Sequence, residues 1–202
     1  MIAIIDYGVG NLFSVKSSFS YIGAEVVVTS DENVIRQAEK LLLPGVGAFE
    51  DAIAKLRSTG LDKVIIEEAN RGKPIMGICL GMQLLFDKSL EFGEHRGLGL
   101  LRGKVVPMAG FIDKSLKIPH IGYNSLIFKK SHPLFKYIND GDYVYFVHSF
   151  YATDCDDSLL ATTEYDKELT AIVAKGNVIG CQFHPEKSGE VGLNILKAFC
   201  EM

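Results

Sequence analysis

Three side chains in two distant segments have the types and spacing that nucleophilic catalysis requires. Cys79 stands between two glycines in segment 77–81, directly after the apolar run 74–76. This arrangement is typical of a tight strand-to-helix turn that exposes a nucleophile. His184 and Glu186, near the end of the sequence, are two residues apart, and such residues point the same way in an extended chain. We therefore predict a catalytic triad of Cys79, His184 and Glu186.

Each member of this triad has a chemical role and a plainer structural explanation. A cysteine at a helix N-terminus is favoured as the reactive thiolate, and a protonated imidazole beside it adds to the effect. In the plainer case, Cys79 is a small apolar residue in a turn, His184 a hydrogen-bonded histidine beside a proline, and Glu186 a surface carboxylate that caps the last helix. One histidine and one carboxylate are too few ligands for a metal, so we expect no metal site.

Thioester chemistry also requires donors for the oxyanion, commonly two backbone amides. The amide of Leu80, directly after the nucleophile, is one candidate. Segment 44–49 follows a neighbouring strand, and its glycines allow the backbone to approach a ligand closely. We expect Val46 or Gly47 to supply the second amide, although a simple strand-to-helix turn would have the same spacing.

The first half of the sequence alternates short apolar runs with stretches of helical period, a pattern that predicts a parallel sheet flanked by helices. Cys79 then lies at the carboxyl end of a strand, where open α/β sheets place their sites. The predicted strands are 1–6, 26–29, 41–43 and 75–78, and the predicted helices are 12–22, a second from about residue 31, and 48–71.

From about Val105 the pattern changes to shorter β-rich pieces, which predict an antiparallel or mixed region. We expect one α/β domain over residues 1–202, with an open, mainly parallel sheet and an antiparallel C-terminal extension. The pieces are 116–128, 142–147, 160–163 and the hairpin 171–174 with 178–183, and a closing helix is predicted over 191–201.

Composition excludes several classes of function. The net charge of −4 provides no basic field for nucleic acid, and no apolar run approaches the length of a membrane span. The four cysteines lack metal-ligand spacing and the N-terminus does not resemble a signal peptide, which favours reduced thiols in the cytoplasm. Segment 8–10 lacks the third glycine of a dinucleotide fingerprint. We expect no cofactor, and a small molecule or another protein as partner.

The segments around these residues resemble the class I, triad-type glutamine amidotransferases. This resemblance rests on Gly-Ile-Cys-Leu-Gly-Met-Gln (77–83), Pro-Gly-Val-Gly-Ala-Phe (44–49) and Gln-Phe-His-Pro-Glu-Lys-Ser (182–188). Three further segments are similar to the glutaminase subunits of imidazole glycerol phosphate synthase: Tyr-Gly-Val-Gly-Asn (7–11), Pro-His-Ile-Gly-Tyr-Asn (119–124) and Tyr-Phe-Val-His-Ser-Phe-Tyr (145–151). The resemblance covers nearly the whole chain and implies a flavodoxin-like fold.

This resemblance implies that the chain hydrolyses L-glutamine to glutamate and ammonia. The ammonia would pass to a (β/α)8 cyclase, the other half of a heterodimer, which makes imidazole glycerol phosphate and AICAR in histidine biosynthesis. Gln83 and the backbone of Gly47, Ser149 and Phe150 would contact the glutamine. The glycine-rich segment 45–47 suggests that the subunit becomes active only when its partner binds a nucleotide ligand.

The resemblance also places five residues toward the cyclase: Asn11, Tyr123, Tyr143, Tyr145 and Lys187. Tyr123 stands where the family usually has tryptophan, and the chain contains no tryptophan, so packing or gating at the boundary is expected to differ. The tyrosine at this position would also be consistent with a paralogue that supplies ammonia to another acceptor enzyme.

The cysteine turn would also suit an amidase or peptidase-like relative, although Gln83 and the pairing of His184 with Glu186 favour the glutaminase. A non-catalytic docking subunit is a further hypothesis, against which the intact triad argues. The remaining histidines are interpreted from their neighbours. His148 is either near the ammonia exit or a satisfied core histidine, and we favour the core. His95, His120 and His132 lie beside glycine or proline and are expected to serve loops.

Overall fold

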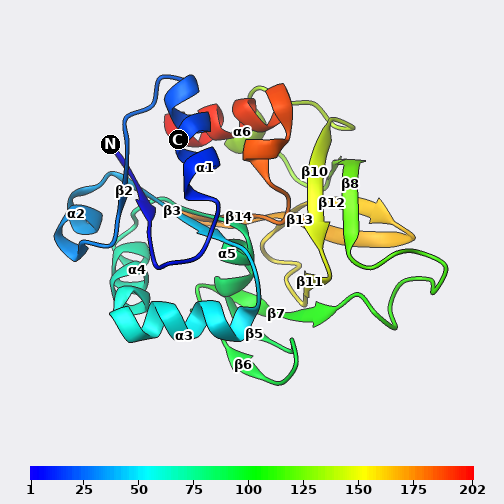
Figure 1. Ribbon diagram of the computed structural model, residues 1–202. Coiled ribbons are helices and arrows are strands. Elements are labelled where there is room, and N and C mark those ends of the chain that lie inside the picture. The colour runs from blue at the N-terminus through cyan, green and yellow to red at the C-terminus, as the bar shows by residue number, and fades with distance from the viewer.

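The computed structural model describes residues 1–202 and is built around an eight-stranded sheet with the order β2-β1-β3-β4-β14-β13-β12-β9 (Figure 1). Neighbours from β2 to β14 are parallel, and those from β14 to β9 are antiparallel. The predicted α/β class is therefore confirmed, including the antiparallel extension. The strands are β1 (Ile2–Ile5), β2 (Val26–Thr29), β3 (Lys40–Gly45), β4 (Ile75–Cys79), β9 (Ile127–Phe128), β12 (Leu159–Tyr165), β13 (Lys167–Lys175) and β14 (Val178–Cys181).

Helices cover both faces of this sheet, which explains why its central strands are apolar throughout rather than alternating (Figure 1). In β1, Ile2 and Ile4 pack in the core beneath α1 and α6, whereas Ala3 and Ile5 pack in the opposite core with α3 and α4. The helices are α1 (Leu12–Tyr21), α2 (Glu32–Gln37), α3 (Phe49–Thr59), α4 (Leu61–Asn70), α5 (Leu80–Leu84) and α6 (Gly189–Glu201).

The helix ends follow local sequence signals. Asn11 caps α1 by accepting a hydrogen bond from the Ser14 amide at 3.4 Å, and Asp31 caps α2. The single helix predicted over 48–71 is wrong, because the chain divides there into α3 and α4. Gly60 adopts a left-handed conformation with φ of 76°, which ends α3 and immediately starts α4.

Two smaller sheets complete the second half, with strand orders β11-β7-β5-β6 and β10-β8. The predicted strand 116–128 is too long, because residues 108–119 form turns and Leu126 separates β8 from β9. The first small sheet contains β5 (Phe86–Ser89), β6 (His95–Arg96), β7 (Leu101–Pro107) and β11 (Phe150–Thr153); the second contains β8 (His120–Ser125) and β10 (Tyr143–His148). Two short 3-10 helices, η1 and η2, span Pro133–Phe135 and Pro185–Lys187.

The pairing of β14 with β4 brings the two halves of the predicted site together. The β13–β14 hairpin inserts β14 beside β4 in parallel register, with Cys181 opposite Ile78. Segment 182–186 therefore leaves the sheet at the same edge as Cys79, although about a hundred residues separate them in sequence. None of the helices combines the length and the apolarity that a membrane crossing requires.

Candidate active site

The turn that carries Cys79 is set by close backbone packing. Cys79 is the last residue of β4 and has φ of 54° and ψ of −112°, a strained conformation for a residue with a side chain. A Cβ atom at Gly81 would lie 1.8 Å from the carbonyl oxygen of Leu43, and one at Gly77 would lie 2.6 Å from the carbonyl oxygen of Gly81. Only glycine fits at either position. The predicted strand-to-helix turn is therefore present.

His184 and Glu186 form a buried pair behind this turn. Nδ1 of His184 and Oε1 of Glu186 are 2.8 Å apart, and the two side chains are 3% and 1% exposed. Glu186 is thus not a surface carboxylate. Because a carboxylate oxygen only accepts, Nδ1 carries the proton of this hydrogen bond, and Nε2 of His184 is buried without a hydrogen-bond partner.

The charge state of His184 reflects opposing effects. Burial disfavours the imidazolium, but the nearby Cys79 and Glu186 outweigh burial and raise the pKa of His184 to about 9. Since Nε2 forms no hydrogen bond, we attribute the influence of Cys79 to charge at short range. The arrangement favours an imidazolium beside the sulfur.

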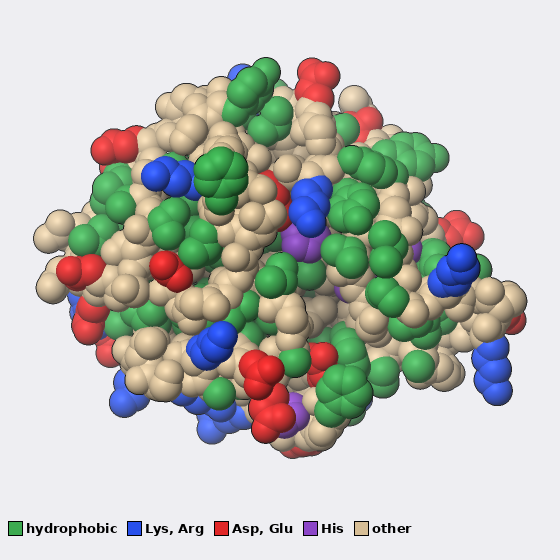
Figure 2. Space-filling view, in the orientation of Figure 1, with side chains coloured by type: hydrophobic (Ala, Val, Ile, Leu, Met, Phe, Trp, Pro, Cys, Tyr) green, Lys and Arg blue, Asp and Glu red, His purple; other side chains and the backbone are tan.

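A pocket of about 390 Å³ opens over Cys79, within the size range of small-molecule sites. In Figure 2 a histidine side chain is visible near the centre of this face, beside a basic side chain and among hydrophobic side chains. The structure brings nine of the predicted site residues together around the pocket: Val46, Gly47, Cys79, Leu80, Gln83, Ser149, Phe150, His184 and Lys187. Four lining residues were not assigned to the site from sequence: Glu91, Pro119, Val147 and His148.

Gln83 lies in α5, one turn after the nucleophile, and is buried rather than exposed. Its Nε2 donates to the carbonyl oxygen of Phe150 at 3.2 Å and to Oε1 of Gln182 at 3.0 Å. Both amide protons are thereby used, and Oε1 of Gln83 accepts no hydrogen bond from the protein. Its position in the pocket wall leaves that oxygen available to a ligand donor.

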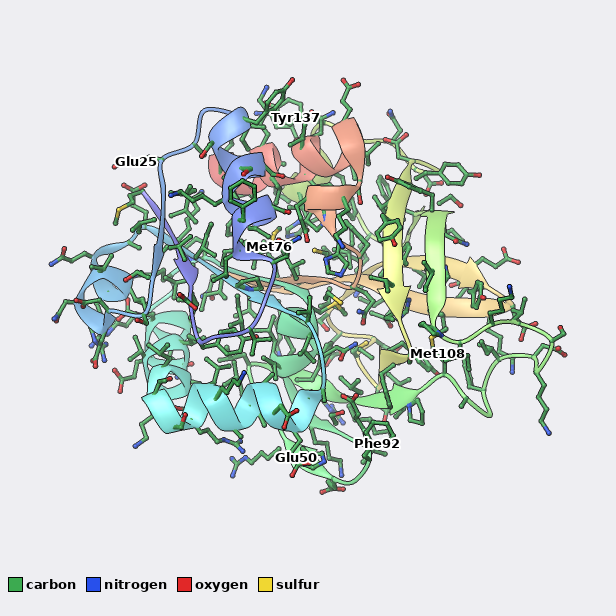
Figure 3. All side chains as sticks on the ribbon, viewed as in Figure 1. Glu25, Glu50, Met76, Phe92, Met108 and Tyr137 are labelled. Atoms are coloured by element: carbon green, nitrogen blue, oxygen red, sulfur yellow. The ribbon has the colours of Figure 1, made fainter.

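Glu91 is a carboxylate in the pocket wall that sequence reasoning missed. It is buried, and its Oε2 accepts a hydrogen bond from the Phe49 amide at the start of α3 at 2.9 Å. Burial raises the pKa of Glu91, and the Phe49 amide partly offsets that effect. The next residue, Phe92, is exposed at the molecular edge and packs edge-on against Phe150 at 6.0 Å between ring centroids (Figure 3). No motif around Glu91 signals this position.

The two histidines of the β8–β10 ribbon are buried and hydrogen-bonded. His148 lines the pocket, and its Nδ1 donates to the carbonyl oxygen of Phe150 at 2.8 Å, while Nε2 lies 3.0 Å from Nδ1 of His120. His148 is therefore both a satisfied core histidine and a pocket residue. The expectation that His95 and His120 serve loops is wrong. His95 lies in β6, and His120 lies in β8 with its ring stacked on Phe146 and Tyr165.

The segment after β3 also lines the pocket and follows the strand that pairs with β4. The Tyr7 hydroxyl donates to the carbonyl oxygen of Pro44 at 2.7 Å and fixes the end of β3. Beyond it, Val46 is partly exposed and Gly47 has φ of 93°, which favours glycine. Both line the pocket together with Leu80, the first residue of α5.

The residues expected to face a partner form a small aromatic cluster on the β8–β10 ribbon. Tyr123 and Tyr143 are 55% and 60% exposed, and Tyr123 packs edge-on against Tyr145 at 5.5 Å between centroids. The Tyr123 hydroxyl donates to the carbonyl oxygen of Lys187 at 2.7 Å, and Nζ of Lys187 lies 5.8 Å from the centre of the Tyr145 ring. The side chain of Asn11 caps α1.

A cysteine on a strained turn, with a buried histidine–carboxylate pair at the same sheet edge, is the arrangement of a cysteine-dependent acyl-transfer enzyme. The family model of class-I glutamine amidotransferases matches residues 3–202, and the chain belongs to this family. Two solved structures agree in fold: a glutamine amidotransferase (TM-score 0.78, 18% identity, 100% and 98% of the two chains covered) and PurLQS from Thermotoga maritima (TM-score 0.75, 23% identity, 99% and 97% covered).

Within this family, the chain is similar to subunit HisH of imidazole glycerol phosphate synthase. It is 53% identical to that subunit from Caldanaerobacter subterraneus subsp. tengcongensis, with 100% of this chain and 98% of the relative covered. It is also 53% identical to the Lactococcus lactis subunit, with 99% and 98% covered. The similarity therefore extends over nearly the full length of both relatives.

Proposed function

We propose that this protein is the glutaminase subunit of an imidazole glycerol phosphate synthase, which hydrolyses L-glutamine to glutamate and ammonia. The observation that carries the proposal is the unpartnered Nε2 of His184 in the same pocket wall as the strained Cys79, with Glu186 bound to the opposite ring nitrogen. This is the geometry that acyl transfer through a cysteine requires. Full-length similarity to HisH subunits supports the choice of substrate.

In the proposed reaction, the Cys79 thiolate attacks the side-chain amide carbon of glutamine. As the carbon–nitrogen bond breaks, Nε2 of His184 protonates the departing ammonia and leaves a γ-glutamyl thioester. His184 then removes a proton from water, which attacks the thioester and returns the electron pair to sulfur. Glu186 keeps the imidazole oriented through the 2.8 Å hydrogen bond and stabilises its charged form.

The oxyanion in both steps requires two donors, which we assign to backbone amides. Leu80 follows the nucleophile at the first position of α5, directly after the Gly45–Cys79 pair that ends the β3–β4 ladder. Val46 or Gly47, which also line the pocket, would supply the other amide. Removing one donor of this kind costs about 10²- to 10³-fold in kcat in comparable hydrolases.

Bound glutamine would be recognised at both of its ends. Oε1 of Gln83 is free to accept from a substrate N–H, and the backbone of Gly47, Ser149 and Phe150 lies beside it in the pocket. We add Glu91 to this set, because a buried carboxylate that has only a backbone donor is suited to the substrate ammonium group.

The acceptor of the ammonia is proposed to be a (β/α)8 cyclase that forms a heterodimer with this chain and makes imidazole glycerol phosphate and AICAR. Free ammonia in neutral water is mostly protonated, so delivery has to be enclosed. The exposed aromatic rings of Tyr123 and Tyr143, with Tyr145 and Lys187 behind them, support an interface on the β8–β10 ribbon. Asn11 belongs to this interface by family resemblance alone.

Three further expectations belong to the same proposal. The chain is expected to work as one domain over residues 1–202, in the cytoplasm, and without a metal or cofactor. The four cysteines, all free thiols, support a reducing compartment.

The test is glutamate release from glutamine by the purified protein, alone and with a (β/α)8 cyclase that carries its nucleotide ligand. Strong stimulation by the liganded cyclase is expected, and high turnover by the lone subunit would contradict partner control. Tyr123 in place of the usual tryptophan favours one second candidate, a paralogue that supplies another ammonia acceptor. Binding without stimulation would point to that paralogue, and folded protein without any turnover would point to a docking subunit.

A further inference from the structure

Gln182 lies beside the nucleophile, although the proposed mechanism gives it no role. Cys181 of β14 pairs with Ile78 of β4, so the next residues along these parallel strands, Gln182 and Cys79, lie at the same level. The Gln182 amide nitrogen donates to the carbonyl oxygen of Ala171 at 2.9 Å, which fixes its main chain. Its side chain is fully buried, where an unpaired amide would be costly.

A chain of hydrogen bonds determines which end of the Gln182 amide faces the sulfur. The carbonyl oxygen of Phe150 can only accept, so the group of Gln83 that contacts it is the NH₂ group. The second proton of that group points to Gln182, whose facing atom must therefore be Oε1. Nε2 of Gln182 is left on the other side, 3.7 Å from Sγ of Cys79.

We propose that Gln182 is a catalytic residue whose side-chain amide donates a hydrogen bond to the Cys79 sulfur and stabilises the thiolate. A donor that faces an ionisable group favours its charged form. The other neutral partner of the sulfur acts in the opposite sense, because the carbonyl oxygen of Val147, at 4.0 Å, can accept only from the protonated thiol. Gln182 thus offsets Val147 and adds to the effect of the His184 imidazolium.

The same series of hydrogen bonds connects the nucleophile to the part of the pocket proposed to bind glutamine. Gln83 bridges Gln182 and Phe150, and the Phe150 carbonyl also accepts from His148 at 2.8 Å. The sulfur, the amide that stabilises it and the backbone beside the bound glutamine are therefore one connected set. This inference deepens the proposed function, on which it rests, because it concerns the same cysteine in the same reaction.

The test is the pH dependence of Cys79 alkylation by iodoacetamide in Gln182→Met, followed by mass spectrometry of the Cys79 peptide. Methionine has a similar shape but donates no hydrogen bond, and Gln83 keeps its Phe150 acceptor. We expect the midpoint of alkylation to rise by about one pH unit, so that about tenfold less thiolate remains at low pH. Alkylation of the partly buried Cys200 provides an internal reference.

The control is Gln83→Met, which removes the group that orients Gln182 but leaves its donor beside the sulfur. We expect a small change in the Cys79 midpoint and an increase mainly in KM for glutamine, whereas Gln182→Met lowers kcat. Gln182→Glu is a second variant of the same size, and its ionised carboxylate should raise the midpoint further than methionine does.

An alkylation profile of Gln182→Met and Gln182→Glu that matches the unaltered protein would overturn the inference, even if glutamine turnover were lost, because the residue would then be only structural. The readout requires no glutamine hydrolysis. A shifted midpoint in the variants, combined with no glutamine hydrolysis by the unaltered protein, would retain the hydrogen bond from Gln182 to the sulfur and reject the proposed function.

Discussion

The two sides of the pocket are held in place by different kinds of interaction. The Cys79 turn is positioned by main-chain contacts with Gly77, Gly81 and the end of β3, where there is no room for a side chain. The His184 side is positioned by polar side chains, through the bond to Glu186 and through Ser188, whose hydroxyl donates to the His184 carbonyl at 2.7 Å. Substitutions on the first side should therefore damage folding, and those on the second should damage chemistry in a folded protein.

Gly81→Ala gives the most severe test of the nucleophile side. The added methyl would lie 1.8 Å from the Leu43 carbonyl oxygen, so the free energy of unfolding should fall by more than about 3 kcal/mol, with loss of all activity. Thermal and urea unfolding measure the change. The matched control is Gly23→Ala, which has φ of 80° and no atom within 4 Å of its new methyl and should cost only about 1 kcal/mol. If both substitutions lowered the free energy of unfolding equally, the steric positioning of the Cys79 turn would be contradicted.

Cys79→Ala removes the sulfur and leaves the turn. Glutamine-dependent synthesis should fall by about 10⁴-fold or more, because no covalent intermediate can form. Synthesis from added ammonium salts by the complex with the cyclase should remain unchanged, since the alanine variant keeps the fold that binds the partner. Both activities are measured in one assay of cyclase product. Loss of both would mean that Cys79 is structural.

Glu186→Gln tests the polar side in a folded protein. The glutamine can still accept from Nδ1 of His184 but carries no charge, so glutaminase activity should fall by about 10²- to 10⁴-fold with little change in unfolding temperature. The pKa of His184, measured by NMR, should decrease. An unchanged pKa would show that Glu186 only orients the ring.

The charge on His184 should also be visible in the stability of the protein. Its pKa is raised from 6.5 to about 9 in the folded state, so its contribution is fully present below pH 6.5 and is lost as pH rises through about 9. We expect the free energy of unfolding to fall over that interval by on the order of 2 kcal/mol. Urea unfolding at several pH values measures it, and His184→Gln should lack this component.

Tyr123→Phe should have the smallest effect. It removes the exposed hydrogen bond to the Lys187 carbonyl while keeping the ring, which amounts to about 0.5–1 kcal/mol. Cyclase-stimulated glutaminase activity should fall by about two- to fivefold, with basal activity unchanged. A reduction of basal activity by the same factor would place this contact in the glutaminase pocket rather than at the boundary.

Local signals were sufficient to predict the parallel half of the sheet and the position of the nucleophile. Each of these signals determines the structure of only a few neighbouring residues. They are the glycines around Cys79, the cap at Asn11 and the apolar runs of β1, β3 and β4. The break at Gly60 was missed because the helical period continues on both sides of it. Strands β5 and β7 were missed because both contain charged residues, and β7 also pairs with the distant strand β11.

The site residues that sequence reasoning missed depend on long-range pairing. Gln182 belongs to the segment that carries His184, but its place beside Cys79 follows from β14 entering the sheet next to β4. Glu91 is held at the pocket by the Phe49 amide, which lies 42 residues away in sequence. His120 was assigned to a loop because it follows a proline, whereas its burial is determined by β10 and Tyr165.

The contact between the Cys79 turn and the end of β3 also bears on how far such sequences can diverge. It involves main-chain atoms on both sides, since a Cβ at Gly45 would lie 2.7 Å from the Gly81 nitrogen and one at Gly81 would meet Leu43. A contact of this kind requires only that a few positions carry no side chain, and it places no demand on which residues fill the surrounding core. The solved glutamine amidotransferase structure, at 18% identity, has the same fold with a TM-score of 0.78.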